Sequence, residues 1–201
     1  VSMILKELQL DPKRFPAKKI QGRISDLKNS LIDPDTYLAS AGLGPDAEIV
    51  AKVYPVYQHR LNAANALDFD DLIMRTVQLF QSNPLVQSSF CRRFRHVLVD
   101  EYQDTNHAQY VLVKLLSGVA GAAINQPEQL EGEPVTAAEL TVVGDSDQSI
   151  YAFRGATVRN IEEFEKDFPG ARTIYLEQNY RSSGNILAAA NAVISHNQSR
   201  H

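Results

Sequence analysis

The chain has 201 residues, of which 44% are hydrophobic and 22% are charged. This length holds one domain with a proper core, or one domain with a smaller appendage, and the composition excludes a disordered or fibrous protein. The formal net charge of −4 provides no global basic field for nucleic acid or an anionic membrane, so any such binding has to be local.

Several features of the sequence bear on where the protein works. Its single cysteine, Cys91, cannot form an internal disulfide, and no group of His and Cys has metal-ligand spacing, which predicts a cytoplasmic protein without a structural metal. No apolar run has the length of a membrane span, and no signal-peptide pattern follows Val1. The start at Val1 and the polar residues 195–201 are what we expect of an internal fragment.

The first third of the chain is expected to form a small helical subdomain. Short apolar stretches between residue 3 and about residue 60 are separated by Pro- and Gly-containing breaks. Helices are predicted to begin near Pro34 and Pro45, and residues 47–61 keep their apolar side chains near helical spacing. No pattern in this part indicates catalytic chemistry.

The middle of the chain is predicted to contain two helices and a strand. The acidic residues at 68–71 suit a helix N-terminus, and residues 72–80 give one apolar helical face. A second helix is expected over residues 85–94. The β-branched run from His96 to Val99 predicts a short strand that is buried on both faces.

The rest of the chain alternates predicted helices and strands. Helices are expected over residues 106–116, 161–168 and 185–194, and strands over residues 140–143 and 173–176. Residues 117–139 lack periodicity and are rich in Gly, Ala, Gln, Glu and Pro, which predicts a loose surface insertion. Strands that alternate with helices indicate an α/β fold with a parallel sheet.

Polar residues gather where the first predicted strand ends. Asp100 and Glu101 follow the strand directly and open what we name the Asp-Glu segment, residues 100–106. Open α/β folds bind ligands at this edge of the sheet, where one carboxylate could hold Mg²⁺ and the other could activate water. A solvated strand end is the alternative interpretation, and Asp104 or Thr105 could equally serve as caps of the following helix.

The second predicted strand leads into another polar loop, which we name the Gly-Asp segment, residues 143–156. Gln148 can sense a terminal phosphate by hydrogen bonding without adding charge. Tyr151 and Phe153 alternate beside Arg154, a composition typical of a base-stacking platform with a phosphate-binding cation. The alternative is that both aromatic rings belong to the core.

A third polar segment, the Tyr-Arg segment of residues 176–182, places Tyr180 next to Arg181. The ring could stack on a planar base, and the guanidinium could neutralise charge on a transferring phosphoryl group. A surface Arg beside a half-buried Tyr is the alternative.

Together and in this order, the three segments resemble motifs II, III and IV of the UvrD/Rep/PcrA family of superfamily 1 DNA helicases. The stretches that carry the resemblance are DEYQDTN, VGDSDQSIYAFRGA and LEQNYRS. It extends through LDFDDLIMRTVQLF back to KELQLDPKRFPAKKIQGRIS, and so covers nearly the whole chain.

The resemblance implies a partial RecA-like sheet of the P-loop NTPase class with a helical subdomain. Residues 1–62 correspond to the helical subdomain, called 1B in the family. Residues 63–171 correspond to the second part of the first RecA-like domain, 1A, with the loose insertion inside it, and residues 172–201 to the opening of the second such domain, 2A.

The resemblance also implies roles for individual residues. Asp100 is expected to bind Mg²⁺ with Glu101 beside it, and Glu101 to activate the attacking water. Gln148 is expected to couple the γ-phosphate to DNA, Tyr180 to stack on the adenine of ATP, and Arg181 to contact the γ-phosphate. Three further residues are expected at the single-stranded DNA track: Tyr151, Phe153 and Arg154.

The implied activity is that of an ATP-dependent DNA helicase of repair or replication, which uses ATP and Mg²⁺ to move along single-stranded DNA and open duplex junctions. Repair or replication proteins are possible partners, and a membrane is not. The sequence lacks a Gly-x-x-x-x-Gly-Lys-Ser/Thr loop, so we expect the 201 residues alone to be inactive. Two alternatives stay open, the motor part of a helicase-nuclease subunit and a non-catalytic module that binds DNA or a partner.

Three departures from the family pattern are visible. Phe153 stands where relatives usually carry Trp, which offers a larger stacking face. Ala152 stands where a basic residue is frequent, and the insertion at 117–139 is absent from the family pattern. Neither of the last two affects the phosphate chemistry.

Overall fold

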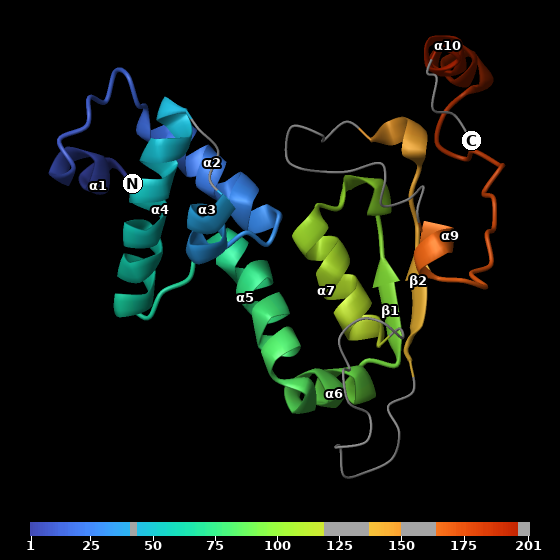
Figure 1. The fold of residues 1–201 in the computed structure, drawn as a ribbon. Coiled ribbons are helices and arrows are strands. Elements are labelled where there is room, and N and C mark those ends of the chain that lie inside the picture. The colour runs from blue at the N-terminus through green and yellow to red at the C-terminus, as the bar shows by residue number, and fades with distance from the viewer. Residues whose placement is uncertain (41–43, 119–136, 150–163, 197–201) are drawn as a thin grey trace. The chain divides into compact units, whose positions relative to one another are not determined.

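The protein was analysed as a computed structural model that describes residues 1–40, 44–118, 137–149 and 164–196 (Figure 1). Its contacts divide the chain into two compact units, each made from separate stretches of sequence. The first unit holds Val1–Val97 and Asn106–Thr141, and the second holds Leu98–Thr105 and Val142–His201. The two units are described separately below.

The first unit begins with four helices, in the part of the chain where short helices are predicted, and we name these four the helical subdomain. They are α1 (Ser2–Glu7), α2 (Ala17–Asn29), α3 (Pro34–Ser40) and α4 (Pro45–Ala63). Pro34 and Pro45 stand at the first positions of α3 and α4, as predicted, because the fixed φ of proline suits a helix start and no hydrogen bond is lost there. The α2 and α4 helices lie side by side in the ribbon (Figure 1).

A hydrophobic cluster holds these four helices together. The spacing of Ile20, Ile24 and Leu27 places one apolar stripe of α2 in this cluster. On α4, Val53 and Tyr54 are fully buried, and the Tyr54 hydroxyl donates a hydrogen bond of 3.1 Å to the Ile32 carbonyl oxygen. The core of the helical subdomain therefore lies between α2 and α4.

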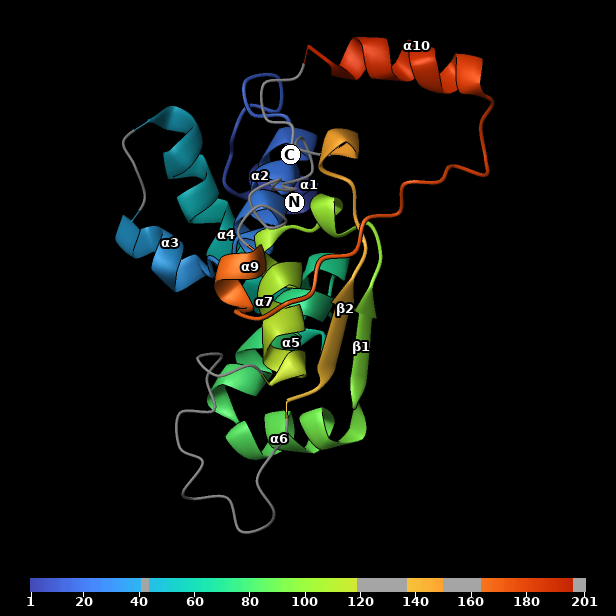
Figure 2. The same cartoon turned by 90° about the vertical axis from the view of Figure 1, so that its right-hand side faces the viewer.

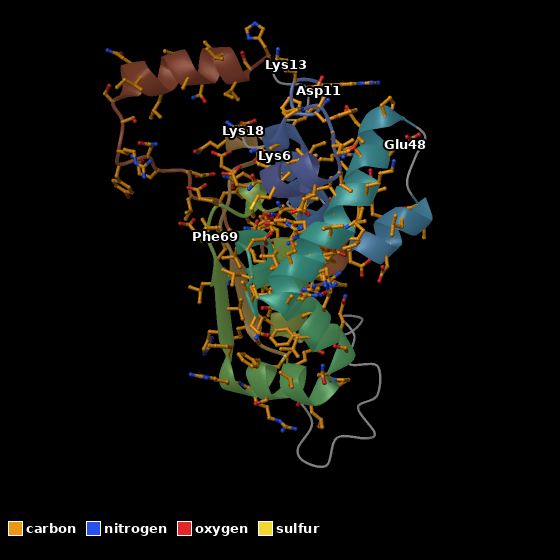
Figure 3. The ribbon with its side chains drawn as sticks, turned by 90° about the vertical axis from the view of Figure 1, so that its left-hand side faces the viewer. Lys6, Asp11, Lys13, Lys18, Glu48 and Phe69 are labelled. Carbon is orange, nitrogen blue, oxygen red and sulfur yellow. The ribbon has the colours of Figure 1, made fainter. Side chains whose placement is uncertain are left out.

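The outer surface of the helical subdomain is charged. Lys6, Asp11, Lys13 and Lys18 are all exposed (Figure 3). Lys6 lies in the last turn of α1, and Lys18 lies in the first turn of α2.

The described part of the first unit also contains the helices α5 (Phe69–Ser82), α6 (Pro84–Arg93) and α7 (His107–Ser117). The predicted positions of all three are confirmed. Val77, Phe80 and Leu115 are buried together, which joins α5 to α7. Phe69 at the start of α5, in contrast, is 90% exposed (Figure 3).

Two of these helices begin with reciprocal capping boxes. Asp68 caps α5 and exchanges hydrogen bonds with Asp71, which confirms the N-terminus predicted from the acidic residues. Asn106 caps α7 and exchanges hydrogen bonds with Gln109. The expectation that Asp104 or Thr105 caps this helix is therefore wrong. Asn106 directly precedes the first helical residue, so its side chain is the one that reaches the free N–H groups of the first turn.

A buried ion-pair network attaches the helical subdomain to α5. Lys28 of α2 is fully buried, and its Nζ lies 2.7 Å from Asp68 Oδ2 and 3.0 Å from Asp71 Oδ1. The Tyr57 hydroxyl of α4 donates to the same Asp68 oxygen at 2.9 Å. Burial by itself would raise the pKa of Asp68, but the hydrogen bonds from Lys28, the Asp71 amide and Tyr57 hold this pKa below its ordinary value.

A second polar contact joins α2 to α7. Asn29 Oδ1 accepts a hydrogen bond of 2.9 Å from the Asn106 side chain, and Asn106 is the residue that caps α7. The helical subdomain is thereby hydrogen-bonded to the residue that ends the Asp-Glu segment.

The two predicted strands form a small parallel sheet (Figure 2). The strands are β1 (His96–Val99) and β2 (Glu139–Val142). Glu139 N–H donates to the Arg95 carbonyl oxygen and Val143 N–H to that of Val99, so the register advances equally along both strands, as in a parallel pair. Exposed and half-buried residues alternate along each strand, so the prediction that β1 is buried on both faces is wrong.

The described residues of the second unit form mostly loops and helices. Two single turns of 3₁₀ helix, Tyr102–Asp104 and Ser146–Gln148, follow β1 and β2. Helices α9 (Phe164–Asp167) and α10 (Gly184–Ile194) lie where helices are predicted, although residues 161–163 of the first lie outside the described residues.

One further prediction is wrong, and another falls mostly outside the described residues. Residues 173–176 form no strand, and Ile174, Tyr175 and Leu176 are exposed, because a strand needs a neighbouring strand to pair with and local β propensity does not supply one. Most of the predicted insertion, residues 119–136, lies outside the described residues. Within the described part of the chain, no helix has the length and apolar character needed to cross a membrane.

Candidate active site

Asp100 and Glu101 stand at the carboxyl end of β1, as the sequence predicts. Both side chains are exposed, so a ligand in solution can reach them. The Glu101 N–H donates a hydrogen bond of 2.9 Å to Asp100 Oδ1, which holds the first carboxylate against the backbone. Two accessible carboxylates supply the hard oxygen ligands that Mg²⁺ prefers, so the residues fit that ion.

Two carboxylates are fewer ligands than a metal site built from protein alone would need. Among the residues that the structure describes, no group of three or more His, Cys, Asp or Glu is placed to hold a metal ion. Mg²⁺ commonly keeps several waters and binds to one or two carboxylates together with substrate phosphates. The pair therefore suits a metal that arrives with a phosphate ligand better than a permanently bound one.

Glu101 has an unusual backbone conformation. Its φ of 49° and ψ of 45° lie in the left-handed region, which a residue with a side chain adopts only at some energetic cost. The chain passes at this residue from β1 into the 3₁₀ turn of residues 102–104. Strained residues of this kind are concentrated at functional sites.

The turn after Glu101 is held by buried side chains. Tyr102 is fully buried, and its ring meets the edge of the Phe164 ring at a centroid distance of 5.5 Å. Its N–H donates to the Val143 carbonyl oxygen at 2.9 Å, and Thr105 Oγ1 donates to the Tyr102 carbonyl oxygen at 2.7 Å. These contacts tie the Asp-Glu segment to the end of β2.

Gln103 is a residue of this site that the sequence analysis did not single out. It is 1% exposed, and its Nε2 donates a hydrogen bond of 2.7 Å to Glu101 Oε2. Its Oε1 accepts from the Asp145 N–H at 3.1 Å. The only signal in the sequence is an amide side chain between the acidic residues of the segment, and an uncharged polar residue in a loop is too common to stand out.

The described part of the Gly-Asp segment carries Gln148 on a 3₁₀ turn. The Asp145 carboxylate accepts a hydrogen bond from Gln148 Nε2 at 2.7 Å and one from the Asp147 N–H at 2.9 Å. Gln148 is exposed and so remains accessible to a ligand. The structure therefore brings Gln148 and Glu101 into one hydrogen-bonded group through Asp145 and Gln103.

The Tyr-Arg segment forms a turn of its own. Asn179 Oδ1 accepts hydrogen bonds from the N–H groups of Arg181, at 2.9 Å, and Ser182, at 2.8 Å. This turn leaves Tyr180 91% exposed and its neighbour Arg181 exposed as well. Within the described residues, neither side chain is hydrogen-bonded to Asp100, Glu101 or Gln148.

The three residues expected at the DNA track, Tyr151, Phe153 and Arg154, lie outside the described residues. Their roles and surroundings stay predictions from the sequence.

A separate hollow of about 840 Å³ lies in the helical subdomain, between α2 and the start of α4. Basic side chains line part of it, among them Arg14, Lys18 and Arg23. Lys19, a fourth basic residue of the lining, is paired with Asp46 at 2.6 Å. None of the candidate residues of the three polar segments lines this hollow.

Accessible carboxylates and an amide at the ends of two parallel strands can bind a metal–phosphate ligand and polarise a water molecule. Comparison with known proteins gives this chemistry a context. Residues 1–169 match the family described as the UvrD/REP helicase N-terminal domain.

Individual relatives are similar over the whole chain. The ATP-dependent DNA helicase UvrD1 of Mycobacterium tuberculosis is 55% identical over 204 residues, which cover 100% of this chain and 25% of the relative. UvrD1 of Mycobacterium leprae is 54% identical over 202 residues, again with 100% and 25% coverage. The ATP-dependent DNA helicase PcrA of Bacillus subtilis is 49% identical over 197 residues, which cover 98% of this chain and 24% of PcrA.

The chain thus spans about a quarter of the length of these relatives. The family match covers most of the 201 residues and includes the Asp-Glu segment and the Gly-Asp segment in full. The chain therefore belongs to the UvrD/REP helicase family.

Proposed function

We propose that this chain supplies the water-activating and metal-binding part of an ATP-dependent DNA helicase, which couples ATP hydrolysis to movement on single-stranded DNA and to duplex unwinding. The observation that carries the proposal is the accessible Asp100–Glu101 pair at the carboxyl end of β1, hydrogen-bonded through Gln103 to the Gly-Asp segment. The names of the relatives, which are ATP-dependent DNA helicases, support it.

The proposed fold is part of a RecA-like domain with a helical subdomain. The two parallel strands with polar loops at their carboxyl ends support a RecA-like sheet. We assign residues 1–62 to the helical subdomain, 63–171 to the first RecA-like domain and 172–201 to the start of the second. With this assignment, the Asp-Glu segment and the Gly-Asp segment both belong to the first RecA-like domain.

Each carboxylate has its own role in the proposed mechanism. Asp100 would hold Mg²⁺ through water, with Glu101 beside it, and the ion would supply positive charge to the phosphates of ATP. Glu101 accepts a proton from the water that attacks the γ-phosphate and orients this water. The hydrogen bond from Gln103 leaves Glu101 Oε1 available to the water.

The remaining candidate residues contact nucleotide and DNA. Gln148 hydrogen-bonds to the γ-phosphate, the Tyr180 ring stacks on adenine, and Arg181 stabilises charge on the transferring phosphoryl group. The high exposure of Tyr180 is compatible with a stacking face that awaits a ligand. Single-stranded DNA is contacted by three residues of the Gly-Asp segment, Tyr151, Phe153 and Arg154.

The 201 residues alone are expected to hydrolyse no ATP. The sequence contains no Gly-rich loop with Lys and Ser or Thr to hold the triphosphate. Functional tests therefore need a full-length helicase that carries this sequence.

The decisive substitution is Glu101→Gln in such a full-length protein. The amide keeps the size of the side chain but takes no proton from water, so ATP turnover should fall by about 100- to 10,000-fold while nucleotide affinity stays within about threefold of wild type. Turnover is measured by phosphate release in the presence of single-stranded DNA, and affinity by titration with a fluorescent ATP analogue.

Glu139→Gln is the matched control. Glu139 begins β2, is 81% exposed and pairs with His96 away from the candidate site. This variant should keep wild-type turnover. Near-normal hydrolysis by Glu101→Gln would remove Glu101 from the mechanism and with it the proposed function of the site.

A further inference from the structure

A chain of hydrogen bonds connects the Asp-Glu segment to the Gly-Asp segment, and its central member is Gln103. Glu101 Oε2 accepts from Gln103 Nε2 at 2.7 Å, and Gln103 Oε1 accepts from the Asp145 N–H at 3.1 Å. Asp145 Oδ2 in turn accepts from Gln148 Nε2 at 2.7 Å. Three hydrogen bonds therefore lead from the side chain of Glu101 to that of Gln148.

The orientation of the Gln103 amide follows from its two neighbours. The backbone N–H of Asp145 can only donate, so the atom that faces it has to be the oxygen of the amide. The nitrogen then faces Glu101, whose carboxylate can only accept when it is ionised. Both partners require the same orientation, and the amide has no equally good alternative.

The burial of Gln103 makes this arrangement rigid. Glu101 is exposed, and a free glutamate on a loop would move among many rotamers. Gln103 is 1% exposed, and the Ser149 hydroxyl donates to the backbone carbonyl oxygen of Gln103 at 3.4 Å. A hydrogen bond from a fixed amide to an ionised carboxylate is short and strong, so Gln103 restricts one oxygen of Glu101 to one place.

We propose that Gln103 is a positioning residue, which holds the Glu101 carboxylate for water activation and links its position to that of Gln148 through Asp145. Gln103 acts through Glu101 and contacts neither water nor nucleotide in the proposed mechanism. This inference rests on the function proposed above for Glu101.

The link has a consequence for the timing of hydrolysis. Gln148 is the proposed contact to the γ-phosphate, and Asp145 accepts its side-chain hydrogen bond in the structure. The Gln148 amide has two N–H groups, so it can donate one to a phosphate and the other to Asp145. A movement of Gln148 toward the phosphate would then shift Asp145, which also carries the N–H that orients Gln103. A change in the Gly-Asp segment can therefore reach the water-activating carboxylate through the buried amide.

Gln103→Glu tests the link in the full-length helicase. The new side chain keeps an oxygen acceptor for the Asp145 N–H but places a second carboxylate oxygen against Glu101 where a donor stood. We expect kcat for DNA-stimulated ATP hydrolysis to fall by about 10- to 100-fold, since a misplaced catalytic group costs this much. The KM for ATP should change by less than about twofold, because nucleotide contacts remain.

Two further variants separate positioning from loss of folding. Gln103→Leu removes both hydrogen bonds without a new charge and should show the same split between kcat and KM. Gln87→Leu is its matched control, because Gln87 is equally buried and donates to the Leu115 carbonyl oxygen at 3.0 Å in the first unit. It should lower the melting temperature in the same way but leave kcat at the wild-type value.

Comparison with Glu101→Gln distinguishes this inference from the proposed function. If Gln103 acts through Glu101, the double variant Glu101→Gln, Gln103→Leu should be no slower than Glu101→Gln alone. Wild-type kcat in Gln103→Glu and Gln103→Leu, together with loss of turnover in Glu101→Gln, would overturn the positioning role alone. If Gln103→Leu lowers kcat by the same factor in the wild-type protein and in Glu101→Gln, the role of Gln103 is merely structural. That result would also overturn the positioning role.

Discussion

Single residues at the candidate site have conformations that only their neighbours can maintain. Glu101 is the clearest case, because its left-handed backbone costs about 1 to 2 kcal/mol for a residue with a side chain. The Tyr102 N–H bond to the Val143 carbonyl oxygen and the Asp104 N–H bond to the Glu101 carbonyl oxygen lie on its C-terminal side and hold the turn. A strained residue that is exposed and carries a proposed catalytic group fits a site prepared for its ligand.

The Phe153 ring offers a prediction at the same scale. Phe153→Ala should weaken binding of single-stranded DNA to the full-length helicase by about 1 to 3 kcal/mol, because one base loses its stacking partner. Fluorescence anisotropy with a labelled oligonucleotide measures this change at fixed salt concentration.

Phe153→Trp is the control, since it enlarges the stacking face and should bind DNA at least as tightly as wild type. The melting temperature of each variant tests the alternative role in the core. Unchanged DNA affinity in Phe153→Ala together with a lower melting temperature would contradict stacking.

Single helices in this chain begin where side chains can satisfy their free N–H groups. The capping box of Asp68 and Asp71 starts α5, and that of Asn106 and Gln109 starts α7. Asn83 also stands at an N-cap position, that of α6, but its side chain makes no capping hydrogen bond. The same residue type therefore contributes differently at two helix starts.

Asn106→Ala should lower the free energy of unfolding by about 1 kcal/mol, since the Gln109 N–H loses its partner. The loss of the Asn29 contact adds to this cost. Asn83→Ala should lower the free energy of unfolding by less than about 0.5 kcal/mol, because no N-cap bond is removed and the Asn83 side chain loses only exposed hydrogen bonds, to the Leu79 carbonyl oxygen and Ser82 Oγ. Urea denaturation of the full-length protein compares the two variants, and equal effects would contradict the capping role of Asn106.

At the scale of the whole molecule, each of the two compact units is formed by separate parts of the sequence. The second unit takes Glu101 from one stretch and Gln148 from another, and the contact between Gln103 and Asp145 joins residues 42 positions apart. Within the first unit, Lys28 meets an aspartate 40 positions later in the chain. The Lys28 contact attaches the helical subdomain to the start of α5.

Lys28→Ala should destabilise the protein by about 3 to 5 kcal/mol, because the buried Asp71 and the partly buried Asp68 both lose the buried cation that lies within 3.0 Å of them. Lys19→Ala is the matched control, since Lys19 pairs with Asp46 at a similar distance but both side chains are more than half exposed. The control should cost less than about 1 kcal/mol. Denaturant titration measures both, and similar costs would contradict a structural role for the buried network.

Acid should weaken the same network. The pKa of Asp68 in the folded protein lies below its value of about 3.9 in an unfolded chain, so the stabilisation is complete above that pH. It is lost as the pH falls through the folded pKa, because the protonated carboxyl no longer attracts Lys28. The acid-dependent loss of stability should be smaller in Lys28→Ala than in wild type.

Local patterns were sufficient to predict most elements of this chain. Helices α4, α5, α6 and α7 lie within two residues of the predicted bounds, because apolar periodicity and capping residues act over one or two helical turns. Strands β1 and β2 were found in the same way. The third predicted strand, at residues 173–176, failed since its formation depends on a partner that local sequence does not specify.

The sequence by itself determined the family of this protein and the identity of its candidate residues, because short stretches such as DEYQDTN keep the chemistry in neighbouring positions. Only the tertiary structure showed Gln103 between Glu101 and Asp145, and the buried Lys28 between Asp68 and Asp71. The contacts from Gln103 to Asp145 and from Lys28 to the aspartates join residues far apart in the chain, and a buried polar group reveals its partner only when folding has removed water from it.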